Sequence, residues 1–134
     1  MRVVVDTNIW VSYLLKPSAP FSSLIKNILD NHVVVYSRAS LHELAEVLSR
    51  DKFSPYLDKE DIRQFLNAFA EKGEAIVVTT TIHACRDPKD NMMLALAKDG
   101  CADMIITGDK DLLTLHPFEG IPIYNPADVL TFLS

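Results

Sequence analysis

The sequence predicts an α/β fold with a central parallel sheet of about five strands, flanked by helices on both faces. Five short apolar runs, most of them rich in Val and Ile, alternate with stretches whose apolar residues recur at helical spacing. Alternation of this kind is typical of parallel sheets whose strands are buried on both faces. A chain of 134 residues can bury one hydrophobic core, so we expect a single domain over residues 1–134.

The expected strands are short, and length rather than period separates them from helices. The first, Val3–Val5, is β-branched throughout and is followed at once by the polar residue Asp6. The others are expected in "HVVVYS" (32–37), "AIVVT" (75–79), "ADMIITGD" (102–109) and "IPIY" (121–124).

Most of the expected helices have apolar residues at three- and four-residue spacing. They cover Ile9–Leu14, ended by Pro17, and then Phe21–Leu29, Ala39–Leu48, Ile62–Ala70, Met92–Ala97, a short turn at Leu112–Leu113, and a last helix in "NPADVLTFL" (125–133). Gly73 and Gly100 follow two of these segments as C-terminal stops. Pro126 stands at a favourable first helical position.

Composition excludes several classes of protein. A hydrophobic share of 49% and a charged share of 23% are those of an ordinary globular protein. The net charge of −5 argues against a nucleic-acid scaffold coated in Lys and Arg, but a nuclease with clustered carboxylates remains compatible with it. We expect a cytoplasmic protein without membrane contact, because the two cysteines form no disulfide framework and neither a signal peptide nor a membrane-spanning run is visible.

Four acids fall where ligands of parallel sheets bind, beyond the carboxyl ends of the strands. Asp6 directly follows the first strand and Asp109 ends the fourth, so the two carboxylates meet at one edge if these strands are parallel neighbours. Glu43 lies in the helix after the second strand, and Asp90 precedes the buried helix before the fourth. We therefore treat these four acids as candidates for one site.

Four carboxylates held together repel one another unless cations lie between them. Mg²⁺ prefers oxygen ligands, so the four acids would hold one or two ions. Such ions activate a bound water and stabilise charge on a phosphoryl oxygen, which is the chemistry of phosphodiester hydrolysis. The sequence contains no phosphate-binding glycine loop, and we find no Ser-His-Asp or Cys-His arrangement that would compete.

Each acid has a plain structural alternative. Asp6 and Asp90 are good helix N-caps, and Asp109 suits a turn, with Asp111 as another candidate for its place in the site. Glu43 suits a solvated surface, although it lies closer to the apolar side of its helix than Glu46 does. Asp87, before Pro88, is better explained as a turn residue than as a ligand.

Four stretches resemble the PIN-domain family, in particular the toxin component of VapBC-like toxin–antitoxin systems. They are "VVVDTNIWVSYLL" (3–15), "SRASLHELAEVLSRDKF" (37–53), "CRDPKDNMMLALAKDGCADMIITGDKDLL" (85–113) and "IYNPADVLTFL" (123–133). The resemblance covers essentially the whole chain and implies a PIN-like fold.

The resemblance also implies an activity and its residues. It implies a ribonuclease, a hydrolase that uses Mg²⁺ or Mn²⁺ on single-stranded or structured RNA, often as a dimer, with an antitoxin protein that occupies the active-site groove. The positions that match the four acids of the family are Asp6, Glu43, Asp90 and Asp109. Those that match its accompanying polar residues are Asn8, Thr107 and Ser37, and Asp111 stays an alternative for the fourth acid.

Substrate and partner contacts are less defined. Basic residues that could hold the RNA backbone flank the predicted acids: Lys16, Arg38, Arg86, Lys89 and Lys110. Trp10 and Tyr13 suit either base stacking or core packing. The segment "FSPYLDKEDI" (53–62) is a candidate for dimer or antitoxin contact.

Three rival functions are kept. A phosphatase of the haloacid dehalogenase type needs a second Asp two residues after the first, where this chain has Asn8. A PIN nuclease of RNA processing and a non-catalytic RNA-binding or scaffold domain are the alternatives to a toxin.

Overall fold

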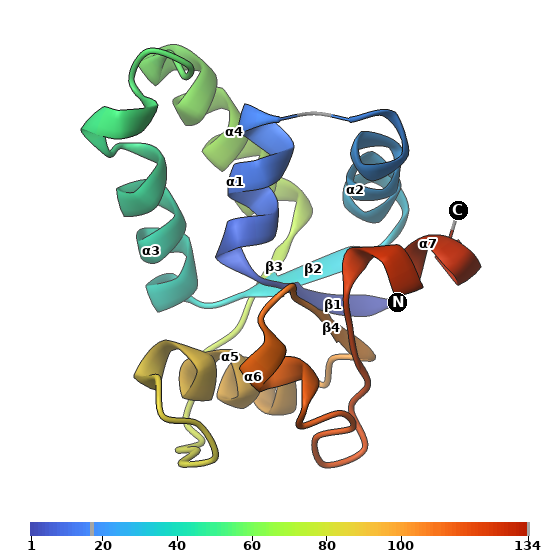
Figure 1. The fold of residues 1–134 in the computed structure, drawn as a ribbon. Coiled ribbons are helices and arrows are strands. Elements are labelled where there is room, and N and C mark those ends of the chain that lie inside the picture. Colours follow the sequence, from blue (N-terminus) through green and yellow to red (C-terminus); the bar gives the residue numbers. More distant parts are fainter. Residues whose placement is uncertain (17, 134) are drawn as a thin grey trace.

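The computed structural model describes residues 1–16 and 18–133, in which seven α-helices and one short 3₁₀ helix surround a five-stranded sheet (Figure 1). The strands are β1 (Arg2–Val5), β2 (Val33–Tyr36), β3 (Glu74–Ala75), β4 (Met104–Ile106) and β5 (Ile123–Tyr124). Their order is β3-β2-β1-β4-β5 and every pairing is parallel. The predicted α/β class with five parallel strands is confirmed.

Side chains alternate across the sheet and divide the core into two layers. In β1, Val3 and Val5 belong to one hydrophobic cluster and Val4 to the other. β4 alternates in the same way, with Met104 and Ile106 on the side of Val3 and Ile105 on the side of Val4. Both faces of the central strands are therefore buried, which explains why their sequences are apolar throughout.

Five helices cover one face of the sheet and two cover the other (Figure 1). The larger layer consists of α1 (Thr7–Leu15), α2 (Ala19–Asn31), α3 (Arg38–Leu48), α4 (Lys59–Lys72) and α7 (Pro126–Leu133), with the 3₁₀ helix η1 (Asp51–Phe53) between α3 and α4. The smaller layer consists of α5 (Pro88–Asp99) and α6 (Lys110–Leu113).

Trp10 of α1 lies in the core of the larger layer. Its ring packs edge-on against Phe69 of α4 at 5.2 Å between centroids and contacts Phe65 at 6.0 Å. With 2% of its surface exposed, Trp10 serves packing. Of the two roles open to it from the sequence, base stacking is thereby excluded in this conformation.

Helix α5 starts earlier than the sequence suggested. The expected segment was Met92–Ala97, but the helix begins at Pro88 and ends at the Gly100 cap. The side chain of Asp87 accepts a hydrogen bond from the Lys89 amide at 2.9 Å and is the N-cap. Pro is favoured at the first helical position, so Asp87 rather than Asp90 caps this helix. The interpretation of Asp87 as a turn residue and that of Asp90 as an N-cap were therefore wrong.

The third strand is shorter than expected. Regular pairing ends at Ala75, although the Ile76 amide still donates to the Tyr36 carbonyl at 2.7 Å. The amides of Thr79 and Thr80 instead donate to the carboxylate of Asp99, at 2.7 and 2.9 Å. These amides are bonded to a carboxylate at the end of α5 and not to a neighbouring strand. The predicted strand through Thr79 was therefore wrong.

Other boundaries agree with the sequence within a few residues. Gly73 caps α4, and α7 starts at Pro126. Pro17, the expected stop of the first helix, lies outside the described residues, and α1 ends at Leu15. None of the helices in the described ranges has the length and apolar character that crossing a membrane requires.

Candidate active site

The carboxyl ends of β1 and β4 carry the first elements of the site. Asp6 directly follows β1 and Thr107 directly follows β4. The two strands pair in parallel, and the Asp6 amide donates to the Ile106 carbonyl at 2.9 Å. The polar residues after both strands thus meet at one edge of the sheet, as the sequence predicted for Asp6 and Asp109.

The buried hydroxyl of Thr107 joins two of the acids. Its Oγ1 donates to Oδ2 of Asp6 at 2.7 Å and accepts a hydrogen bond from the amide of Asp109 at 3.0 Å. Thr107 is 0% exposed and Asp6 is 8% exposed. A single side chain therefore orients the Asp6 carboxylate and the turn that presents Asp109.

Asp6 and Asp109 also cap helices. Oδ1 of Asp6 accepts from the Asn8 amide at 3.1 Å at the start of α1. Oδ1 of Asp109 accepts from the Asp111 amide at 2.9 Å at the start of α6. Each cap uses one carboxylate oxygen, so the structural and the functional interpretations of these two residues are compatible.

Asp90 lies in the first turn of α5 and is 7% exposed. Its pKa is raised to about 6, first by burial and then by the negative charges of Asp109, Asp87 and Asp6, with a hydrogen bond to Asp109 acting in the same direction. Three acids that are distant in sequence therefore lie near one another. We call Asp6, Asp90 and Asp109 the aspartate cluster.

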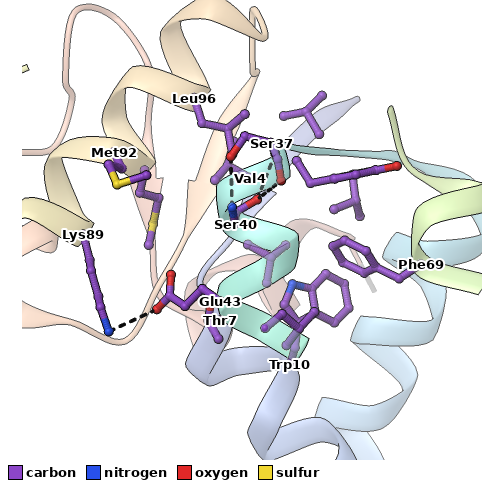
Figure 2. A pocket seen from close by; sticks show the side chains of 16 residues that line it. Val4, Thr7, Trp10, Ser37, Ser40, Glu43, Phe69, Lys89, Met92 and Leu96 are labelled. Carbon is purple, nitrogen blue, oxygen red and sulfur yellow. Dashed lines mark hydrogen bonds and ion pairs between the residues drawn. The ribbon is translucent and has the colours of Figure 1, made fainter. Parts of the chain in front are cut away.

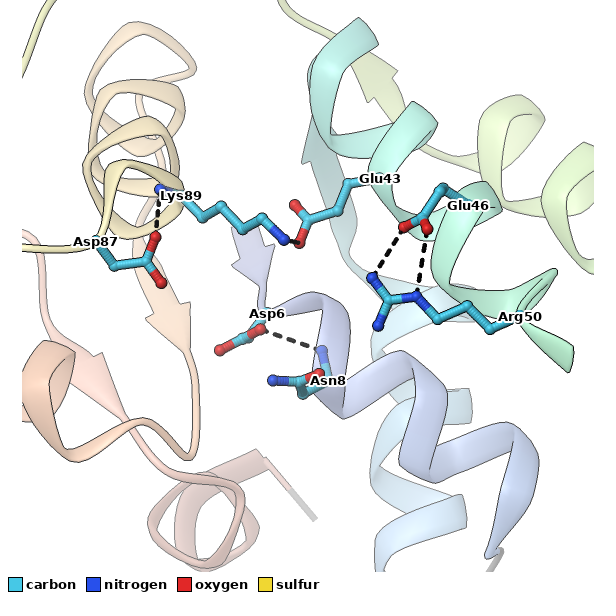
Figure 3. Close-up of polar contacts among 7 residues, drawn as sticks. All are labelled: Asp6, Asn8, Glu43, Glu46, Arg50, Asp87 and Lys89. Atoms are coloured by element: carbon cyan, nitrogen blue, oxygen red, sulfur yellow. Dashed lines mark hydrogen bonds and ion pairs between the residues drawn. The ribbon is translucent and has the colours of Figure 1, made fainter. Parts of the chain in front are cut away.

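Glu43 stands apart from the aspartate cluster. It projects from α3, and its Oε1 lies 3.7 Å from the Nζ of Lys89, whose side chain reaches over from α5 (Figure 3). Glu46 points elsewhere and pairs with Arg50 of its own helix end at 3.1 Å. Of the two glutamates of α3, the partly buried Glu43 is thus the one that faces the site.

A small pocket of about 50 Å³ lies beside Glu43, between the ends of β1 and β2 and the helices α3 and α5 (Figure 2). Trp10 and Phe69 are among its apolar lining residues, and Ser37, Glu43 and Lys89 are among its polar ones. The pocket is too small for a nucleotide.

The remaining predicted residues have structural contacts. Ser37 forms a reciprocal capping box with Ser40 at the start of α3, with distances of 3.0 and 2.8 Å. Asn8 contacts Asp6 through its backbone amide. The Asp111 carboxylate lies 3.7 Å from Arg86 and is largely exposed. The structure therefore brings Asp109, and not Asp111, to Asp90.

Sequence reasoning missed Asn91 as a positioning residue. Its amide side chain accepts from the Cys85 amide at 2.8 Å and donates to the Cys85 carbonyl at 3.0 Å. This double hydrogen bond closes the loop that leads into α5 and so fixes the helix start next to Asp90. The available signal was that Asn91, with its amide side chain, directly follows the candidate ligand Asp90. That its partner is Cys85 could not be predicted from the spacing.

The donor set fits a hard divalent cation by its chemistry. Carboxylate oxygens are the ligands that Mg²⁺ takes in proteins, often only one or two of them with water completing the shell. In residues 1–16 and 18–133, no three His, Cys, Asp or Glu side chains are grouped closely enough to hold one ion together. Burial raises the pKa of Asp90 first and the neighbouring carboxylates raise it further; a bound cation would neutralise the charge of these carboxylates.

Comparison with known proteins agrees with this architecture. A sequence model of the PIN domain matches residues 2–111. The uncharacterized protein MJ1680 of Methanocaldococcus jannaschii is 34% identical over 118 residues, covering 87% of this chain and 76% of that protein. The chain belongs to the PIN domain family.

Two solved structures share the fold. The crystal structure of VapBC2 from Rickettsia felis, bound to a DNA fragment from their promoter, matches with a TM-score of 0.64 and 18% identity. The crystal structure of FitAcB from Neisseria gonorrhoeae matches with a TM-score of 0.55 and 15% identity. Each match covers 93% of this chain and 98% of the other chain. The predicted PIN-like fold is confirmed.

Proposed function

We propose that this protein is a metal-dependent endoribonuclease that hydrolyses phosphodiester bonds in single-stranded or structured RNA. The observation that carries the proposal is the aspartate cluster, where three acids from separate segments lie near one another at the carboxyl edge of β1 and β4. Burial, and then the negative charges of its neighbours, raise the pKa of Asp90 in this cluster to about 6. Membership of the PIN domain family supports the same chemistry.

The residues of the site have distinct tasks in this proposal. Asp6, Asp90 and Asp109 would hold Mg²⁺ or Mn²⁺, and Thr107 keeps Asp6 and Asp109 oriented through its hydroxyl. A divalent ion held there would lower the pKa of a water bound to it and would stabilise charge on the scissile phosphate. Glu43 projects from α3 toward Lys89 of α5 and would orient the attacking water.

We further propose that the protein is the toxin of a toxin–antitoxin pair, with an antitoxin protein as its partner. The likeness to the VapBC2 structure supports this assignment at the level of the fold, as does the sequence resemblance to VapBC-like toxins. Co-expression with the product of an adjacent small gene should relieve growth arrest caused by this protein. A protein that does not arrest growth would favour the RNA-processing alternative.

The direct test is cleavage of a labelled single-stranded RNA in Mn²⁺, in Mg²⁺ and in chelator. Asp90→Asn removes the charge of Asp90 but keeps the shape of its side chain. Because Asp90 is not the helix cap, this change leaves the cap of α5 intact. Asp87→Asn is the matched control, because Asn caps helices as well as Asp does and Asp87 lies only three residues away. Cleavage should require the metal, be lost in Asp90→Asn by at least 100-fold, and persist in Asp87→Asn.

Other outcomes contradict the proposal in different ways. Equal cleavage by wild type and Asp90→Asn would mean that Asp90 is not in the active site. No cleavage of any RNA by wild type, together with no binding of Mn²⁺, would favour the non-catalytic alternative.

A further inference from the structure

Lys89 connects the two helices that flank the site. Its side chain leaves the first turn of α5 and ends 3.7 Å from Glu43 on α3, above Asp6 in Figure 3. The Lys89 side chain is 61% exposed and that of Glu43 is 32% exposed. Exposed ion pairs contribute little to folding stability. The effect of this pair that matters here is on the charge of Glu43.

Both acids of α3 have a cationic partner from the chain itself. Glu43 is paired with Lys89, and Glu46 is paired with Arg50 through two hydrogen bonds of 3.1 and 3.3 Å. The aspartate cluster has no such partner among the described ion pairs, and its charges act on one another instead. The negative charge that a divalent ion would neutralise is therefore concentrated at the aspartates and reduced at Glu43.

We propose that Lys89 takes the place of a second cation at Glu43, so that the site binds a single divalent ion at the aspartate cluster. The proposal rests on the metal site of the proposed function and fixes its stoichiometry. The ammonium group of Lys89 compensates the charge of the Glu43 carboxylate and repels a further cation. A Mg²⁺ or Mn²⁺ ion at this position would also have to lose water to reach a carboxylate that is already paired.

Titration with Mn²⁺ alone tests the stoichiometry. The number of bound ions is measured by calorimetry and from the electron paramagnetic resonance signal of the free ion. Wild type should bind one ion, and Asp90→Asn should lose it. Lys89→Met should bind two ions, because Glu43 is then free. The double variant Lys89→Met with Glu43→Gln should return to one ion.

Two further variants separate this mechanism from a general charge effect. Lys89→Arg keeps the positive charge and should bind one ion. Lys110→Met removes a cation next to Asp109 that forms no ion pair among the described residues, and it should leave the stoichiometry at one.

The outcomes distinguish the two proposals. Two ions bound to wild type, or one ion bound to Lys89→Met, would overturn the role of Lys89 and leave the metal site intact. No Mn²⁺ bound by either protein would overturn the metal site, and the role of Lys89 with it.

Discussion

Thr107 shows how one side chain can organise a site made of acids. Its hydroxyl is the donor to Asp6 and the acceptor for the Asp109 amide, and it is fully buried. A buried hydroxyl that makes two hydrogen bonds stabilises the fold, and here it restricts the rotamer of the Asp6 side chain and holds the backbone turn at Asp109. Asp6 and Asp109 are therefore oriented without a bound ion.

Replacing Thr107 by Val should weaken the site more than the fold. Val has nearly the same shape but leaves Oδ2 of Asp6 and the Asp109 amide without this partner, which costs about 1–3 kcal/mol of stability. Loss of such supporting contacts typically reduces metal affinity or activity by about 10- to 100-fold. Urea unfolding and Mn²⁺ titration would measure the two effects. Thr107→Ser keeps the hydroxyl and should behave like wild type; an equal loss in both variants would refute the role of the hydroxyl.

The raised pKa of Asp90 makes folding stability depend on pH. In the unfolded chain this carboxyl titrates near 3.8 and in the metal-free folded protein near 6, so the folded state binds more protons between these values. The free energy of unfolding therefore falls as the pH rises from about 4 to about 6. The loss of stability is complete about one pH unit above the folded pKa, where Asp90 is almost fully ionised.

Asp90→Asn should consequently stabilise the metal-free protein at neutral pH. The shift corresponds to an upper limit of about 3 kcal/mol, and we expect a gain of about 1–3 kcal/mol at pH 7.5 in chelator. At pH 4 the gain should be close to zero because Asp90 is then protonated in the wild type. Denaturant unfolding at both pH values measures the difference. A variant less stable than wild type at pH 7.5 would show that Asp90 has a stabilising partner instead.

At the scale of elements, the sequence predicted the layers well and the starts and ends of some segments poorly. Apolar runs such as Val3–Val5 and the polar residues after them sufficed to predict that Asp6 lies at the carboxyl edge of a parallel sheet. The start of α5 was ambiguous because "RDPKDN" offers two aspartates that can cap a helix. Asp87 is the cap because proline is favoured at the first helical position, directly after the cap, and Pro88 follows Asp87.

Contacts between distant segments could not be read from the sequence at all. The end of β3 depends on Asp99, which lies 20 residues from Thr79 in the chain. The pairing of Glu43 with Lys89 likewise depends on how α3 and α5 are placed across the sheet. Family resemblance indicated which acids belong together, but it did not indicate that Glu43 would be paired with a cation.

Asp99 should control the order of the segment that follows β3. Its carboxylate accepts hydrogen bonds from the amides of Thr79 and Thr80 and from the Thr80 hydroxyl, and these bonds lower its pKa. Because the pKa is lowered, the contact persists at neutral pH and is lost only as the pH falls through that lowered value. Asp99→Ala at pH 7 should increase amide hydrogen exchange in residues 76–83 by about tenfold or more.

Lys98→Ala is the matched control for this exchange experiment. Lys98 lies on the same turn of α5 but pairs with Glu119, so its removal should leave residues 76–83 unchanged. Equal exchange in wild type and Asp99→Ala would mean that packing of Ile76, Val78 and Ile82 alone orders the segment.

At the scale of the whole molecule, the aspartate cluster lies where the two helical layers meet. Asp6 caps α1 of the larger layer, whereas Asp90 lies in α5 and Asp109 caps α6, both in the smaller layer. An ion held by these acids would bind the folded chain and not the unfolded one, in which the three residues are far apart. Binding of this kind stabilises the native state by mass action.

Mn²⁺ should therefore raise the melting temperature of the wild-type protein at pH 7.5. At a concentration 100-fold above the dissociation constant, the stabilisation is about 2.7 kcal/mol, which corresponds to roughly 5–10 °C for a chain of this size. At pH 5 the shift should be much smaller, because the Asp90 pKa of about 6 means that a proton then competes with the ion. Asp90→Asn should show little shift at either pH. Thermal unfolding with and without Mn²⁺ measures the shift for both proteins at both pH values. A wild-type shift that is the same at pH 5 and pH 7.5 would place the ion away from Asp90.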